Sequence, residues 1–152
     1  MWLTPNFSLE QLIYSETAER ERIDNTPAPE IMNQLLRLAQ GLEQVRTLTG
    51  YPLDISSGYR CPELNARIGG AMSSQHTRGE AVDFTCAEYG PPLDIIKAIR
   101  ASDIDFDQCI LEYARWVHIS FSAAPRGRVL TIYDAKDGYL DGLWDEGGKE
   151  IA

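Results

Sequence analysis

The chain contains two histidines, and each lies in a segment whose residue types suit a metal ligand. His76 precedes Asp83 across a turn favoured by Gly79, while His118 follows Trp116 at the alternate spacing of one face of a strand. Two imidazole nitrogens and one carboxylate oxygen are a usual protein ligand set for catalytic zinc, with the fourth position left for water. The spacing therefore predicts a metal hydrolase in which His76, Asp83 and His118 bind Zn²⁺.

Each of these three residues also has an ordinary structural explanation. A single histidine is more often a structural residue than a ligand, and an aspartate beside a turn often caps it. The string from Ser74 to Asp83, Ser-x-His-x-x-Gly-x-Ala-x-Asp, followed later by Trp-x-His, is much more specific than any one residue. We therefore favour the metal site, and we expect the Trp116 indole to form a wall of it beside the substrate.

The three cysteines do not suggest a disulfide framework. Cys61, Cys86 and Cys109 are odd in number and widely spaced, and no Cys-x-x-Cys pair occurs. We expect buried free thiols. A Cys–His nucleophile is a weaker alternative, because none of the three lies in a recognisable catalytic signature.

Composition and charge narrow the function classes. The 152 residues suffice for one domain with a substantial core. The formal net charge of −9 argues against binding to nucleic acid or to an anionic membrane surface, because both need basic patches. No apolar stretch reaches the roughly 18 residues of a membrane span. Residues 1–6 lack the basic and apolar regions of a standard secretory signal, so we expect synthesis in the cytoplasm.

Helices are expected mainly in the first half of the chain. Residues 30–49 carry apolar side chains every three or four positions and end at Gly50, which predicts the clearest helix. A capping pattern starts another short helix at Ser8. Further helices are predicted at 62–68 and 92–101, whereas the polar segment 16–29, with its two prolines, is predicted to be a loop.

Strands are expected mainly in the second half. The predicted strands are 53–56, 81–84, 108–113, 116–122 and 128–133, with a turn at Ala114-Arg115. Helices followed by a β meander indicate an α+β fold, an antiparallel sheet with flanking helices. Residues 136–152 are interpreted as a C-terminal extension, frayed around Trp144.

Three strings make the sequence resemble the M15 zinc peptidases: Ser57-Gly58-Tyr59-Arg60, Ser74 to Asp83, and Trp116-Val117-His118. That family includes D-Ala-D-Ala carboxypeptidases and dipeptidases and phage L-alanyl-D-glutamate endopeptidases. The resemblance covers residues 7–133 and is strongest to the short single-domain branch found in phages and prophages. It implies the α+β fold shared with the Hedgehog signalling domain, one zinc peptidase domain with its core at about residues 7–135, and His76, Asp83 and His118 as the zinc ligands.

A zinc peptidase needs a general base, and the resemblance does not supply one directly. Many family members have a catalytic Glu or Asp three residues before the last histidine, where this chain has Arg115. Glu112 is the best substitute. A tight turn would pair Glu112 with Val117, whereas a looser turn would set it opposite His118, and the sequence leaves both registers open.

Two further residues, Arg60 and Ser74, are predicted to bind the substrate. Arg60 follows a strand at a glycine turn, where its guanidinium is predicted to bind a substrate carbonyl or carboxylate and to stabilise the oxyanion. The alternative is a structural arginine that braces the 69–74 loop. By resemblance Ser74 hydrogen-bonds substrate, and its alternative is a turn cap.

The sequence thus predicts a zinc-dependent peptidase that hydrolyses amide bonds next to D-amino acids in peptidoglycan stem peptides, as a carboxypeptidase or an endolysin-type endopeptidase. The expected setting is the cell wall, in phage lysis, infection or wall turnover, and a monomer is favoured. A non-enzymatic wall-binding or phage structural module with the same fold is the main alternative, because position 115 lacks the carboxylate.

Overall fold

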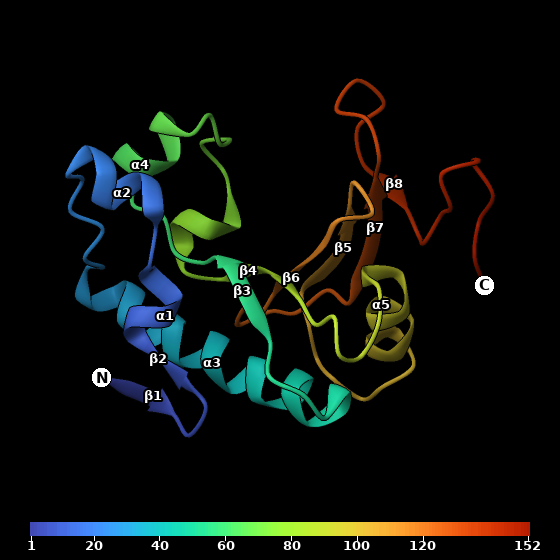
Figure 1. The fold of residues 1–152 in the computed structure, drawn as a ribbon, viewed down its shortest axis with the longest axis horizontal. Coiled ribbons are helices and arrows are strands. Elements are labelled where there is room, and N and C mark those ends of the chain that lie inside the picture. Colours follow the sequence, from blue (N-terminus) through green and yellow to red (C-terminus); the bar gives the residue numbers. More distant parts are fainter.

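A six-stranded sheet forms the centre of the protein in a computed structural model, which describes residues 1–152 (Figure 1). The strand order is β3-β4-β6-β5-β7-β8. The strands are β3 (Asp54–Ser57), β4 (Ala81–Thr85), β5 (Gln108–Glu112), β6 (Trp116–Ser120), β7 (Arg128–Ile132) and β8 (Leu140–Asp141). With the helices described below, the fold is α+β, as the sequence predicts.

One pair of strands departs from the predicted meander, because β7 runs parallel to β5. The β6 strand is already paired with β4 and β5, so the next strand must join an edge of the sheet, and the edge of β5 is nearer to β6 than that of β3. The end of β6 lies beside the start of β5, and the short link 121–127 stays at that end of the sheet. Accordingly β7 begins where β5 begins and runs in the same direction.

Helices surround the sheet and a small hairpin precedes them. The helices are α1 (Leu9–Ile13), α2 (Glu16–Glu21), α3 (Pro29–Thr49), α4 (Pro62–Arg67) and α5 (Pro92–Arg100), a 3₁₀ turn η1 occupies Gln75–Arg78, and the hairpin pairs β1 (Trp2–Thr4) with β2 (Phe7–Ser8). None of the helices combines the length and apolarity needed to span a bilayer.

The α2 helix corrects the prediction of a loop over residues 16–29. Ser15 caps α2, with its Oγ accepting a hydrogen bond from the Ala18 N–H at 3.2 Å. Arg22 ends the helix in the left-handed conformation, with a φ of 57°. This six-residue helix depends on capping and has one buried side chain, so apolar periodicity gave no signal for it.

The main core lies between one face of the sheet and helices α3 and α5. The apolar stripe of α3 contributes Leu35, Leu38 and Leu42, all fully buried. Alternate strand residues such as Phe84 and Ile119 pack against the same cluster. In Figure 1, α3 runs along the lower side of the sheet and α5 lies near β5 and β6, so this face is closed to solvent.

The C-terminal segment is ordered against the sheet, which corrects the expectation of a frayed tail. β8 pairs with β7, and Leu143 is fully buried. The Ile151 N–H donates to the Leu143 carbonyl at 2.7 Å, so the last residues fold back on this segment. A single buried leucine in a polar stretch carries little periodicity, and the contact was therefore not predictable from pattern alone.

Candidate metal centre

His76 lies on η1, directly above the open face of the sheet. Its Nδ1–H donates to the Gly58 carbonyl at 2.8 Å, which leaves Nε2 3.3 Å from Asp83 Oδ1. Glycine is required at position 58 because its backbone packs so closely on Leu12 that a Cβ there would collide with the Leu12 carbonyl oxygen. Gly79 ends the turn with a φ of 70°, a conformation that favours glycine, and so returns the chain into β4.

His118 lies directly opposite Asp83 in the β4–β6 pair. Its Nδ1 is 3.1 Å from Asp83 Oδ1, and its Nε2 is 3.1 Å from Gln75 Oε1. The two imidazole rings are 5.1 Å apart with an interplanar angle of 74°. Burial alone would raise the pKa of the Asp83 carboxyl, but hydrogen bonds from His118 and His76 outweigh it and keep that pKa well below its usual value.

The three donor groups fit a divalent cation. Ligand atoms of His76, Asp83 and His118 all lie within 4.8 Å of one another. The outer nitrogen of each imidazole lies within hydrogen-bond distance of an oxygen, the Gly58 carbonyl or the Gln75 amide, and the inner nitrogen faces Asp83, where a bound cation would be held. The structure therefore brings together the predicted ligand set, oriented as a metal site requires.

Glu112 borders this centre from β5. Its Oε1 is 3.6 Å from His118 Nδ1 and accepts a hydrogen bond from Trp116 Nε1 at 3.2 Å. Burial raises the pKa of the Glu112 carboxyl, and the neighbouring His118 partly opposes this shift. Of the three carboxylates that precede His118 in β5 and its approach, Glu112 is the one within 4.0 Å of this histidine.

The hairpin between β5 and β6 has neither of the two predicted registers. Glu112 pairs with Trp116, so the turn contains three residues, Tyr113–Arg115. Tyr113 and Ala114 both have a φ of 57°, and this left-handed pair accommodates the extra residue. Glu112 and His118 consequently share the open face as diagonal neighbours, while Arg115 is exposed on the turn.

Arg60 lies on the other side of the cavity. Its backbone N–H donates to the His76 carbonyl at 3.1 Å, and its Nη2 donates to Ser74 Oγ at 3.2 Å. Its Nε is buried without a partner. Burial lowers the pKa of Arg60, while Asp83 and Glu112 oppose that shift. A cationic group with an unused donor beside two carboxylates suits an anionic or carbonyl oxygen of a ligand.

Ser74 has two structural partners. Its Oγ accepts from the His76 N–H at 3.2 Å, as a turn cap does, and also accepts from Arg60. Ser74 therefore caps the η1 turn and also borders the cavity. Neither contact tests the prediction that Ser74 binds substrate.

A cavity of about 460 Å³ joins these groups. It is lined by Arg60, Gly70, Ala71, Ser73, Ser74, Gln75, His76, Asp83, Gln108, Ile110, Glu112, Trp116, His118, Leu130 and Tyr139. Every predicted site residue is among them. Two lining residues, Gln75 and Tyr139, were not predicted from the sequence. The position of Gln75 inside the motif could have identified it. Tyr139 lies in a polar segment without a motif, so no pattern pointed to it.

The three cysteines lie outside this cavity. All are free, and Cys86 and Cys109 are buried. Burial raises the pKa of the Cys109 thiol far above its usual value, which leaves it protonated and unreactive. The expectation of buried free thiols is thus confirmed for Cys86 and Cys109, whereas Cys61 is free but only partly buried.

Comparison with known proteins agrees with the geometry. A family model described as Peptidase M15 matches residues 5–120, which include the three donor residues, Arg60 and Glu112. A comparison with curated protein sequences returned no match. The peptidases of this family depend on a metal, in keeping with the convergent His, Asp and His side chains. On the extent of this match and the site it contains, the chain belongs to the M15 peptidase family.

Proposed function

We propose that this protein is a zinc-dependent peptidase that hydrolyses amide bonds next to D-amino acids in peptidoglycan stem peptides. The observation that carries the proposal is the convergence of His76, Asp83 and His118 within 4.8 Å, with Glu112 3.6 Å from His118. Zinc favours this set of two imidazoles and one carboxylate over the all-oxygen sets that Mg²⁺ and Ca²⁺ prefer. The family match supports the peptidase reaction, whereas zinc and the stem-peptide substrate go beyond that match.

The chemistry divides between the metal and the side chains around it. When bound, zinc would polarise the scissile carbonyl and lower the pKa of water at its open position to about 7. Glu112 takes the proton from the attacking water and delivers it to the departing amine. Burial raises the pKa of the Glu112 carboxyl and so favours its uptake of the proton, while the hydrogen bond from Trp116 Nε1 opposes that shift and orients the carboxyl.

Arg60, Ser74 and Trp116 orient the substrate. The Arg60 side chain lines a cavity that also contains the carboxylates of Asp83 and Glu112. A D-amino acid carboxylate or the scissile carbonyl oxygen matches that guanidinium. Ser74 contributes a hydroxyl beside it, and the Trp116 ring forms the wall that faces the peptide chain.

The setting of this activity is the bacterial cell wall. Cleavage of D-Ala-D-Ala, of L-Ala-D-Glu or of a cross-link all satisfy the chemistry, and phage lysis, infection or wall turnover would each use it. We propose that the protein acts as a monomer, without nucleic acid or membrane partners, after synthesis in the cytoplasm.

Digestion of purified peptidoglycan, followed by mass spectrometry of the released fragments, tests the proposal. We expect new amino groups at one bond beside a D-residue, abolished by a chelator and restored by zinc. Zinc binding without any release would instead support the wall-binding module. Activity that survives the chelator but not a thiol reagent would support a cysteine hydrolase.

A further inference from the structure

A second cavity, of about 610 Å³, adjoins the cavity of the metal centre, and Trp116 lines both. Its other lining residues are Tyr113, Arg115, Tyr133 and Glu146. The first two come from the turn between β5 and β6, whereas Tyr133 follows β7 and Glu146 lies in the C-terminal segment. Tyr133 and Glu146 lie beyond residues 5–120, which match the family model, so the match does not account for this cavity.

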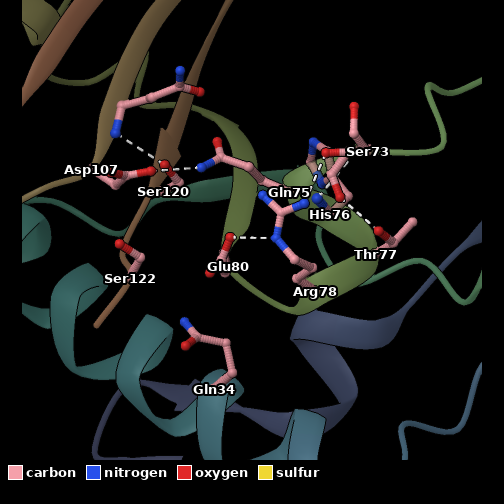
Figure 2. Close-up of polar contacts among 12 residues, drawn as sticks. Gln34, Ser73, Gln75, His76, Thr77, Arg78, Glu80, Asp107, Ser120 and Ser122 are labelled. Atoms are coloured by element: carbon pink, nitrogen blue, oxygen red, sulfur yellow. Dashed lines mark hydrogen bonds and ion pairs between the residues drawn. The ribbon is translucent and has the colours of Figure 1, made fainter. Parts of the chain in front are cut away.

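The other end of β5 has polar groups that are already paired with one another. Asp107 lies directly before β5, whereas Trp116 pairs with the last residue of that strand. Gln75 Nε2 donates to Asp107 Oδ2 at 2.8 Å, as the dashed line in Figure 2 shows. The buried Asp107 also pairs with Arg126 at 2.8 Å. Because these groups bind one another, they leave a ligand few free charged atoms at that end, and the cavity beyond Trp116 is the better continuation of the site.

Aromatic rings form the wall of the second cavity. The ring centroids of Tyr113 and Trp116 are 5.7 Å apart, with an interplanar angle of 55°. Trp116 Nε1 donates to Glu112 Oε1 at 3.2 Å. The Tyr133 hydroxyl donates to the Trp144 carbonyl at 2.7 Å. Because these polar atoms already have partners inside the protein, Trp116 and Tyr133 offer a ligand ring surface, which attracts methylene groups and cations.

Two side chains of opposite charge line the same cavity without a partner. Arg115 and Glu146 are both exposed, and the side chain of neither takes part in an ion pair or a hydrogen bond within the protein. Arg115 lines this cavity and not that of the metal centre. The left-handed residues Tyr113 and Ala114 precede it, so the three-residue turn places the guanidinium on the outer side of Trp116.

The charges and rings together define the ligand. A guanidinium binds a carboxylate through paired hydrogen bonds, and a carboxylate beside aromatic faces binds an ammonium group. We propose that the second cavity binds the end of a peptide side chain that carries an ammonium and a carboxylate on the same carbon. Arg115 binds the carboxylate, Glu146 binds the ammonium, and the methylenes lie along the rings. The inference rests on the proposed function, since Trp116 joins the cavity to the metal centre, and it names the substrate group that sets specificity.

Two tripeptides that differ by one carboxylate test this assignment. The third side chain of L-Ala-γ-D-Glu-meso-diaminopimelate ends in both groups, whereas that of L-Ala-γ-D-Glu-L-lysine ends in the ammonium alone. Titrations of the full chain without added metal, so that the peptides stay intact, are followed by the ¹H–¹⁵N signals of its three tryptophan indoles. We expect both tripeptides to shift the Trp116 signal, with about three- to tenfold tighter binding of the diaminopimelate peptide.

Exchange of each charge separates the two contacts. Arg115→Gln should abolish the preference between the tripeptides, because the extra carboxylate binds there. Glu146→Gln should weaken both tripeptides by about two- to fivefold and leave their ratio unchanged, because both carry the ammonium. Arg37→Gln and Glu63→Gln are the matched controls, since these residues are exposed and line neither cavity, and they should leave both affinities unchanged. All four side chains are exposed, so the variants should fold as the wild type does.

Three results would overturn the inference. The first is equal affinity of the wild-type protein for the two tripeptides, which needs no variant. The second is a preference that survives Arg115→Gln. The third is a Trp116 signal that responds to N-acetylglucosamine oligomers and not to the tripeptides, which would assign the cavity to the glycan. Because none of these measurements depends on cleavage, they remain distinct from a failure of the proposed peptidase activity.

Discussion

The two faces of strands β4, β5 and β6 use alternate residues of the same chain for different purposes. On β6, Val117 and Ile119 point into the apolar core, while His118 between them points into the metal centre. The apolar face needs volume and shape, which several side chains can supply. The open face needs particular donor atoms at particular distances, so a single exchange there removes function while the sheet remains.

The largest expected effect is the loss of a ligand on the open face. His118→Ala removes one of the three donors, and we expect zinc affinity to fall by more than the roughly 100-fold typical of residues behind a ligand, with peptidase activity lost. Equilibrium dialysis against zinc measures the affinity. Retention of wild-type affinity would show that His118 is not a metal ligand and that the open face is not a metal site.

The next effect concerns the proton carrier. Glu112→Gln keeps the shape of the side chain but cannot take a proton, so we expect turnover to fall by about 10²- to 10⁴-fold while zinc remains bound. The exposed Glu63 on α4 offers a control, since Glu63→Gln removes a carboxylate that does not line the cavity. Initial rates on isolated stem peptides measure the change, and a rate near wild type would assign the base to another group.

Substitutions on the apolar face should lower the stability of the fold and leave the zinc affinity unchanged. Ile119→Ala, next to His118 in sequence but fully buried in the core, should lower the free energy of unfolding by about 2–5 kcal/mol. Below the unfolding transition its zinc affinity should equal that of the wild type. Chemical denaturation and zinc titration of the same sample make the measurement. A variant that is as stable as wild type but loses zinc would reverse the roles assigned to the two faces.

How far the sequence predicts this arrangement depends on the kind of contact. The sequence predicts the three donors His76, Asp83 and His118 because a motif fixes their spacing. Apolar residues on either side of Asp83 and His118 also identify β4 and β6 as strands. The register of Glu112 could not, because it depends on two left-handed residues, Tyr113 and Ala114, that no propensity favours.

The second half of the sheet also contains contacts that local sequence patterns do not predict. The β7 strand runs parallel to β5 because it joins the nearest free edge of the sheet. That edge exists only after the other strands have assembled, so a local pattern does not predict the pairing. Tyr139 reaches the cavity because β8 pairs with β7, and the segment around it has no apolar pattern. Local patterns predicted most elements, whereas long-range pairing decided which other side chains reach the site.

The smallest expected effect is a pH dependence behind the open face. Since Arg126 lowers the pKa of Asp107, the stability due to this pair is fully present above the unfolded pKa of about 4 and is lost as the pH falls through the lower folded pKa. At neutral pH, Asp107→Asn should cost about 1–3 kcal/mol of unfolding free energy. Denaturation curves should show that this difference shrinks below about pH 4; a difference that is constant down to about pH 2 would contradict the assignment.

The position of bound zinc directly tests whether His76, Asp83 and His118 form the metal centre. A crystal grown with zinc, measured on both sides of the zinc absorption edge, should show one anomalous peak per chain at about 2.0–2.2 Å from His76 Nε2, Asp83 Oδ1 and His118 Nδ1. The same experiment on Asp83→Ala should show no peak there. Zinc bound elsewhere, or a peak that persists in Asp83→Ala, would contradict the central claim that these three side chains form the metal centre.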